Sequence, residues 1–213
     1  MTDYSKLDHY SLKAQKEGYP ARSVYKLKEM DEKFGLLRHC RKASFKALDL
    51  GAAPGSWSLY VLRKLPLAND GSRNGGRALV SVDLAPLSRQ YDQGLFDNPE
   101  FLFIQGDFTI GEVREAIISG GQYNLVVSDA APSTTGNRSV DTLRSLALSE
   151  IALDYAETTL AKGGNMVIKV FQGGDTAALL KKMRSLFESA KSFKPQACRA
   201  ESFETYYLGL GKK

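Results

Sequence analysis

The apolar residues of this chain fall into short continuous runs separated by segments with helical spacing. A short apolar run bounded by turn residues is typical of a buried strand. Such runs predict strands at about 46–50, 78–83, 101–105, 123–128 and 165–171, and an aromatic run predicts a last strand at 203–210. Because helical segments lie between the strands, the pattern predicts an α/β fold with a parallel, doubly wound sheet and helices on both faces.

Three segments carry the helical pattern most clearly. In 22–34, one face is formed by Val24, Leu27 and Met30. A long helix is marked by Leu146, Leu153 and Leu160, and we expect Gly163-Gly164 to end it. A third helical stripe consists of Leu179, Leu180, Met183, Leu186 and Phe187. The stretch Pro66–Gly76, rich in glycine and polar residues, is predicted to be a mobile surface loop.

The composition predicts one domain. With 213 residues, 43% of them hydrophobic, the chain can bury one sizeable core. We therefore expect a single domain over 1–213, with a basic helical segment at 1–45 and the sheet core at 46–213. No apolar run approaches the ~20 residues that a membrane span needs, and the polar N-terminus lacks the apolar core of a signal peptide. We expect a cytoplasmic protein without a membrane partner.

Cysteines and histidines are few, and none has a metal-type spacing. They are Cys40, Cys198, His9 and His39. This pattern predicts two reduced thiols and no metal site.

The net charge of +5 is unevenly distributed along the chain. Residues 1–46 carry 11 Lys/Arg against 6 Asp/Glu, and residues 181–213 carry 8 against 3, so each end has a net charge of +5. The middle, 47–180, carries 10 against 15 and has a net charge of −5. We expect the two ends to lie on the same face as the carboxyl ends of the strands, where they would form a basic surface that attracts phosphate backbones. A solvated charged exterior explains the composition equally well.

The segment FKALDLGAAPGSW, residues 45–57, has the pattern of a strand, a tight glycine turn and a helix start. Gly51 and Gly55 lack the G-x-G of a dinucleotide fingerprint, and no lysine follows them as in a P-loop. Asp83, at the end of the next strand, is suited to a ribose diol. The turn therefore indicates a nucleoside ligand without a pyrophosphate, with S-adenosylmethionine as the leading candidate. The alternative is a tight turn without a ligand.

Acidic residues end three successive predicted strands, at Asp83, Asp107 and Asp129. One such residue is explained as a helix N-cap, but three beside a glycine turn indicate ligand contacts. Lys169 lies inside an apolar strand, where the cost of desolvating an ammonium group indicates a functional role. The alternative is a lysine that faces solvent at a sheet edge.

Taken together, the motifs resemble the FtsJ/RrmJ family of S-adenosylmethionine-dependent ribose 2′-O-methyltransferases acting on RNA. The similarity extends from Gln15 to the C-terminus through ARSVYKLKEM (21–30), DLGAAPGSW (49–57), VDLAP (82–86), QGDF (105–108), SDAAP (128–132) and GGNMVIKVFQG (163–173). The chain departs from the family at Ser56, where many members have a second glycine, and in the long 66–77 loop. The resemblance implies a Rossmann-like, mostly parallel seven-stranded sheet with a C-terminal antiparallel strand.

The resemblance also implies a catalytic tetrad, matched here by Lys26, Asp129, Lys169 and Glu204. Lys169 would accept the proton of the ribose hydroxyl and must be neutral to do so. Burial and the nearby Lys26 would lower its pKa from a reference value of about 10.4. Asp129 and Glu204 would orient Lys169 or hold the ribose. Three residues of the same types are excluded by their positions: Lys28, Lys162 and Glu201.

By the same resemblance, S-adenosylmethionine is bound by Gly51, Gly55, Trp57, Asp83, Asp107 and Asp129. Asp83 would bind the ribose hydroxyls, Asp107 would meet the adenine amino group, and Phe108 would lie beside the ring. No metal is required, because the leaving group is a neutral thioether. For Trp57 the alternative is a core position. Candidate phosphate contacts outside the site are Arg22, Lys181, Lys182, Lys194 and Arg199.

The implied partner is RNA rather than DNA. Short bacterial members of the family point to a uridine of large-subunit (23S-type) ribosomal RNA, free or in a ribosomal particle. The segment GYPARSVYKL, residues 18–27, is also common in methyltransferases of the tRNA anticodon loop, so tRNA is the alternative. The complete tetrad speaks against a non-catalytic RNA-binding assembly factor, and the missing fingerprint against a nicotinamide-dependent oxidoreductase. Nothing in the sequence demands an oligomer, so we expect a monomer.

Overall fold

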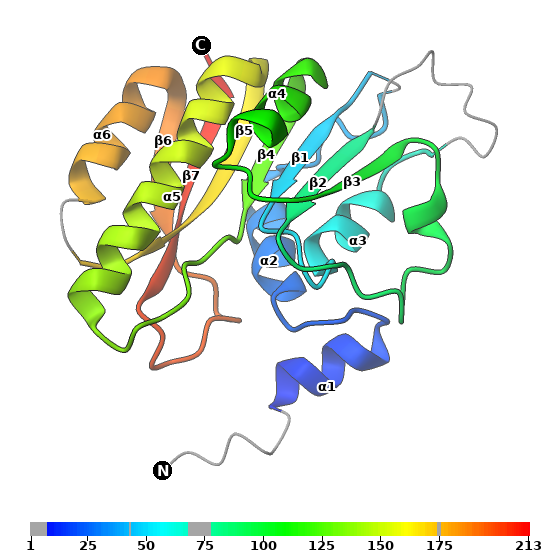
Figure 1. Cartoon of the computed structure of the whole chain (residues 1–213), viewed down its shortest axis with the longest axis horizontal. Coiled ribbons are helices and arrows are strands. Elements are labelled where there is room, and N and C mark those ends of the chain that lie inside the picture. The colour runs from blue at the N-terminus through cyan, green and yellow to red at the C-terminus, as the bar shows by residue number, and fades with distance from the viewer. Residues whose placement is uncertain (1–7, 43, 68–77, 174–175) are drawn as a thin grey trace.

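The computed structural model describes residues 8–42, 44–67, 78–173 and 176–213 (Figure 1). They contain a seven-stranded sheet of order β3-β2-β1-β4-β5-β7-β6. The strands are β1 (Ala47–Leu50), β2 (Leu79–Asp83), β3 (Phe101–Gln105), β4 (Tyr123–Ser128), β5 (Leu160–Phe171), β6 (Phe187–Phe193) and β7 (Glu204–Lys212). Among them, only β7 runs in the direction opposite to that of the other six strands. The mostly parallel sheet with an antiparallel C-terminal strand is therefore confirmed.

Helices cover both faces of the sheet (Figure 1). They are α1 (His9–Lys16), α2 (Val24–Phe34), α3 (Ser56–Leu62), α4 (Gly111–Ser119), α5 (Arg138–Thr159) and α6 (Thr176–Leu186), with a short 3₁₀ helix, η1, at Leu95–Asp97. Residues of α2 and α3 share one hydrophobic core, and residues of α4, α5 and α6 share the other. No helix in the described ranges is long and apolar enough to cross a membrane.

The degree of burial explains why the hydrophobic pattern predicts some strands and misses β6. β1 and β4 lie in the middle of the sheet and are covered on both faces, so most of their residues are apolar and buried. β6 lies at the edge, where Phe187 is its one fully buried residue, and its sequence therefore lacks such a run. The helical stripe had included Phe187, but this residue begins β6.

The long helix ends earlier than the sequence pattern predicts. α5 ends at Thr159, and Leu160 is already the first residue of β5. Gly163, with φ +77°, and Gly164 lie in an irregular part of β5, where the register with β4 shifts. These glycines therefore bend a strand rather than end a helix. Most of the predicted 66–76 loop lies outside the described residues.

The strand order indicates at which edge of the sheet a ligand would bind. It reverses between β1 and β4, and ligands of such sheets bind outside the carboxyl ends of the strands at this point. β7 begins at the same edge, because its first residue, Glu204, pairs with Phe171, the last residue of β5. The strands thus bring residues from distant parts of the sequence together.

Candidate active site

The glycine turn after β1 allows a close approach of two strand ends. Gly51 has φ +76°, and a Cβ on this residue would lie 2.5 Å from the Cα of Ala130, which follows β4. Gly55, with φ +108°, is the N-cap of α3, where a Cβ would come within 2.9 Å of the Phe96 ring. Gly51 thus allows contact between the turns after β1 and β4, and Gly55 allows α3 to start against Phe96.

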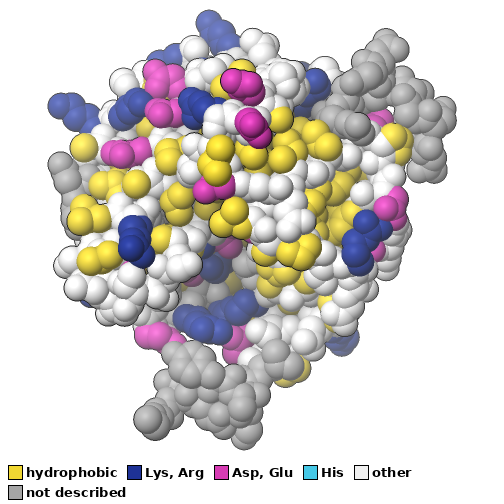
Figure 2. Space-filling view, viewed as in Figure 1, with side chains coloured by type: hydrophobic (Ala, Val, Ile, Leu, Met, Phe, Trp, Pro, Cys, Tyr) yellow, Lys and Arg dark blue, Asp and Glu magenta, His cyan; other side chains and the backbone are white. Residues whose placement is uncertain are grey.

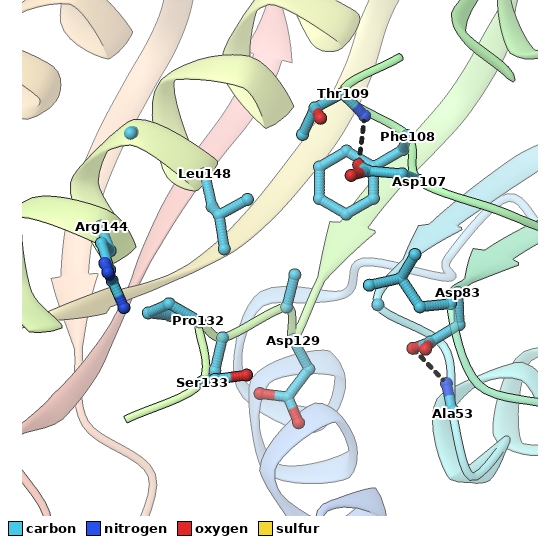
Figure 3. A pocket seen from close by; sticks show the side chains of 15 residues that line it. Ala53, Asp83, Asp107, Phe108, Thr109, Asp129, Pro132, Ser133, Arg144 and Leu148 are labelled. Carbon is cyan, nitrogen blue, oxygen red and sulfur yellow. Dashed lines mark hydrogen bonds between the residues drawn. The ribbon is translucent and has the colours of Figure 1, made fainter. Parts of the chain in front are cut away.

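A cavity of about 660 Å³ opens at this edge (Figure 3). Its walls come from the ends of β1 to β4 and from the first half of α5, through Gly51, Ala53, Asp83, Leu84, Asp107, Phe108, Thr109, Asp129, Ala130, Ala131, Pro132, Ser133, Arg144, Ala147 and Leu148. This volume is within the range of about 300–1,000 Å³ that is typical of small-molecule sites. The cavity thus unites Gly51 with all three carboxylates that the sequence singled out.

The carboxylates of Asp83 and Asp107 are held by backbone groups. Asp83 accepts hydrogen bonds from the N–H groups of Ala53 and Ala85, both at 2.8 Å. Asp107 accepts one from Thr109 N–H at 2.8 Å, beside the ring of Phe108 (Figure 3). Because each carboxylate oxygen has two lone pairs, both side chains retain acceptor positions for a ligand.

Two of the predicted cofactor residues do not line the cavity. Gly55 shapes the turn beneath it, as described above. Trp57 is 2% exposed, and its indole N–H donates to the carbonyl of Ser23 at 2.8 Å. This contact fixes the start of α2 against α3 and favours the core position that the sequence left open for Trp57.

The four residues of the expected tetrad lie in two adjacent ion pairs. Lys169 Nζ is 3.0 Å from Asp129 Oδ1, and it also donates to the Asp129 carbonyl. Lys26 Nζ is 2.6 Å from Glu204 Oε1. All four side chains are only 8–16% exposed. Because Lys169 is buried, it does not face solvent at a sheet edge, and its position favours a functional role.

Tyr206 connects the two ion pairs, and the sequence analysis did not identify it. Its hydroxyl donates to Asp129 Oδ1 at 2.7 Å, and its ring centre is 5.7 Å from Lys26 Nζ. Tyr206 is fully buried in the middle of an aromatic strand. Its position two residues after Glu204, on the same face of β7, was the available signal.

The ion pairs set the charge states of the site. Burial alone would raise the pKa of Asp129, but Lys169, Lys26 and the Tyr206 hydrogen bond hold this pKa below its usual value. Burial alone would lower the pKa of Lys26, but Asp129 and Glu204 raise it above its usual value. At neutral pH, Asp129 is therefore ionised and Lys26 is protonated.

Comparison with known proteins connects this geometry to a family. The FtsJ-like methyltransferase family matches residues 19–212, which include all four tetrad positions. The chain belongs to the FtsJ-like methyltransferase family.

Two relatives that match nearly the whole chain share one description. The "Ribosomal RNA large subunit methyltransferase E" of Treponema denticola is 48% identical over 99% of this chain and 97% of its own length. The protein of the same description from Oleidesulfovibrio alaskensis is 45% identical over 97% and 92%. A crystal structure from Plasmodium falciparum, described as a ribosomal RNA methyltransferase, covers 91% of this chain and 98% of its own with a TM-score of 0.68. At 24% identity, it shows the shared fold.

Three residues resembling tetrad members lie elsewhere in this methyltransferase. Lys28 is 4.0 Å from Glu17, on another face of α2 than Lys26. Lys162 lines a separate cavity with His39, near the amino ends of the strands. Glu201 is exposed in the loop before β7. Their positions agree with the exclusions made from the sequence.

The two basic ends of the chain share one face only in part. Phe193, Lys194 and Gln196 of the C-terminal end line one cavity with Lys13, Lys28 and Lys33 of the N-terminal end. The lysines of α6 and of the last two residues lie elsewhere. Lys212 donates to the carbonyls that end α5, and Lys213 to those that end α6. Lys182 pairs with Asp154 at 3.2 Å and Glu157 at 3.1 Å, in the last turns of α5. The C-terminus lies at the opposite end of the molecule from α1 (Figure 1). Because β7 runs antiparallel, it carries Lys212 and Lys213 away from the candidate site.

The other candidate phosphate contacts differ in their surroundings. Arg22 pairs with Asp8 and donates to the Ala197 carbonyl at 2.6 Å, so it fixes the segment before β7. Lys194 donates to the Ser202 carbonyl at 2.6 Å. Lys181 and Arg199 are exposed.

Proposed function

We propose that this chain transfers a methyl group from S-adenosylmethionine to a ribose 2′-hydroxyl, in a uridine of large-subunit ribosomal RNA. The observation that carries the proposal is the pair of buried Lys–carboxylate contacts, Lys169–Asp129 and Lys26–Glu204, beside a nucleoside-sized cavity. These groups can position a hydroxyl and remove its proton without a metal ion.

The cavity residues fit S-adenosylmethionine. Asp83 offers carboxylate acceptors for the ribose diol, and Asp107 offers an acceptor for the adenine amino group beside the apolar ring of Phe108. Asp129 lies on the same cavity wall and adjoins Lys169, so the methionyl end would be directed toward the tetrad. A cluster of carboxylates also favours a ligand with cationic groups.

Lys169 is the proposed acceptor of the proton from the ribose 2′-hydroxyl. The cofactor supplies a methyl group already activated by its sulfonium. Lys26 stays protonated and Asp129 stays ionised, so Lys169 is the other amine of the tetrad. We assign it the hydroxyl proton as the new O–CH₃ bond forms, a step that requires the free amine. Asp129 then stabilises the resulting ammonium through the 3.0 Å contact. Glu204 holds Lys26 in place.

The relatives favour ribosomal RNA over tRNA. Both bacterial relatives named above are described as large-subunit ribosomal RNA methyltransferases, and their similarity covers nearly the whole chain. The tRNA alternative has no comparable support. Such a substrate would place the protein in the cytoplasm. Because all four tetrad residues come from one chain, the proposed reaction needs no second copy.

Methyl transfer from labelled S-adenosylmethionine tests the proposal. Unmodified large ribosomal subunits should gain label, and total tRNA should not. Lys169→Ala should lower turnover by about 10²–10⁴-fold and leave cofactor affinity nearly unchanged. Lys162→Ala is the matched control, because Lys162 is an exposed lysine of the same strand. Label in tRNA would overturn the substrate assignment, and near-normal turnover of folded Lys169→Ala would overturn the role of this base.

A further inference from the structure

The cavity extends past Asp129, away from the end lined by Asp83 and Asp107. This second part is formed by Pro132 and Ser133 from the loop after β4 and by Arg144 from α5 (Figure 3). The cofactor residues considered above leave it without an assigned role. Arg144 is the one cationic side chain among the described residues that line the cavity, which also contains three carboxylates.

Arg144 is available for a ligand. It is exposed on α5, and no carboxylate of the described residues lies within 4.0 Å of its guanidinium. Asp141, one helical turn earlier, accepts hydrogen bonds from Thr135 N–H at 2.7 Å and Thr135 Oγ1 at 2.8 Å. The Asp141 carboxylate is thus held by the loop. Besides these hydrogen bonds, the charge of Arg144 contributes to the lowered pKa of Asp141, but the two groups do not form a close ion pair, and the guanidinium lines the cavity.

The helix start that carries Arg144 is well anchored. Asn137 caps α5 by accepting from Ser139 N–H at 3.1 Å and Val140 N–H at 3.3 Å. A guanidinium on such a base can bind an oxyanion with less loss of freedom than one on an unanchored loop.

Apolar side chains lie next to Arg144. Val140, 36% exposed, lies one helical turn before Arg144 on the same side of α5, and Leu143, 63% exposed, lies on the neighbouring side. Hydrophobic side chains gather across the middle of this face of the molecule, which is hollowed below its centre (Figure 2). An apolar surface beside a single cation suits a nucleotide, because its base is largely apolar on its faces and its phosphate is anionic.

We infer that the start of α5 binds the target nucleotide and that Arg144 contacts a backbone phosphate next to the methylated ribose. The inference rests on the proposed function and adds a substrate-binding residue outside the tetrad. A 2′-hydroxyl placed at Lys169 and Asp129 has its own 3′-phosphate within one nucleotide, and Arg144 lies on the side of Asp129 opposite the cofactor end (Figure 3). A guanidinium matches two phosphate oxygens in a planar fork.

Steady-state kinetics with unmodified large ribosomal subunits test this assignment. In Arg144→Gln, we expect the KM for subunits to rise about tenfold, with kcat at saturating subunits and the Kd for S-adenosylmethionine nearly unchanged. The log–log dependence of KM on salt should become less steep by about 0.7, the value for one phosphate contact on a single strand. Arg144→Lys should keep the salt slope and recover part of the KM effect.

Arg184→Gln is the matched control, because Arg184 is an exposed arginine in the last turn of α6, away from the cavity. It should leave both the KM and the salt slope unchanged. An unchanged KM and slope in Arg144→Gln would overturn the inference. So would an equal effect in Arg184→Gln, or a loss of S-adenosylmethionine affinity that matches the rise in KM, which would assign Arg144 to the cofactor. In each case, label transfer by the wild-type protein would leave the proposed function standing.

Discussion

Asp49 combines complete burial with an unsatisfied oxygen, and its replacement by asparagine should stabilise the protein above neutral pH. Its side chain is 1% exposed at the end of β1. Oδ2 accepts a hydrogen bond from Ser58 Oγ at 2.7 Å, whereas Oδ1 has no hydrogen-bond partner among the described residues. Burial, together with the charges of Asp129 and Asp83, raises the pKa of Asp49 to about 7, and the Ser58 hydrogen bond only partly opposes this.

The size of the effect follows from this pKa. The ordinary value for aspartate is 3.8, so the folded state binds the proton more tightly by about three pKa units. At about 1.4 kcal/mol per unit, the difference is on the order of 4 kcal/mol. Because the folded state holds more protons than the unfolded state between pH 4 and 7, the free energy of unfolding falls as pH rises through this interval. Above about pH 7, the whole contribution of Asp49 to the free energy of unfolding has been lost.

Urea unfolding of wild type and Asp49→Asn, measured from pH 4.5 to 8.5, provides the assay. The asparagine has nearly the same shape, can still accept from Ser58, and does not ionise. Its advantage over wild type should grow with pH and reach up to about 4 kcal/mol near pH 8. The difference between the two curves removes the contributions of all other titrating groups.

Asp31→Asn is the matched control. Asp31 is also buried, but its oxygens accept from Leu37 N–H at 2.8 Å and Tyr60 Oη at 2.9 Å, and Lys64 is 3.0 Å away. Loss of this satisfied charge should destabilise the protein. Parallel curves for wild type and Asp49→Asn would refute the reasoning, because they would mean that Asp49 does not titrate between pH 4 and 7.

Four further outcomes are expected. Asp83→Ala should weaken S-adenosylmethionine binding by about 1–3 kcal/mol, and unchanged affinity in calorimetry would remove Asp83 from the cofactor site. Tyr206→Phe removes the hydrogen bond to Asp129 and should lower kcat about tenfold in the labelling assay, which an unaltered kcat would contradict. Gly51→Ala should cost at least about 1–3 kcal/mol in urea unfolding, because its Cβ has no space; wild-type stability would show that the two turns can separate. Lys182→Glu should leave the KM for ribosomal subunits unchanged, because Lys182 pairs with α5 far from the site; a raised KM would return α6 to the RNA surface.

Much of the fold and of the candidate site was predictable from the sequence, because the signals are local. The central strands are buried on both faces, so their apolar runs located β1 to β4 within one residue. The glycine turn and the acidic strand ends follow directly from these strands. A buried lysine such as Lys169 is conspicuous because its neighbours in the strand are apolar. The tetrad positions follow from the family resemblance, whose motifs lie in separate segments of the chain.

Other features depend on contacts between distant segments, and only the tertiary structure decided them. β6 is an edge strand with little burial, so it has no hydrophobic signature. Tyr206 becomes part of the site because antiparallel β7 places its hydroxyl on Asp129, 77 residues away in sequence. Arg144 reaches the cavity because the first half of α5 lies beside the carboxyl ends of the strands. The same strand direction sends Lys212 and Lys213 to the far end, so only part of the C-terminal basic stretch lies beside the N-terminal one. Residue type and spacing thus determined which groups are available, and chain direction in the folded sheet determined which of them meet.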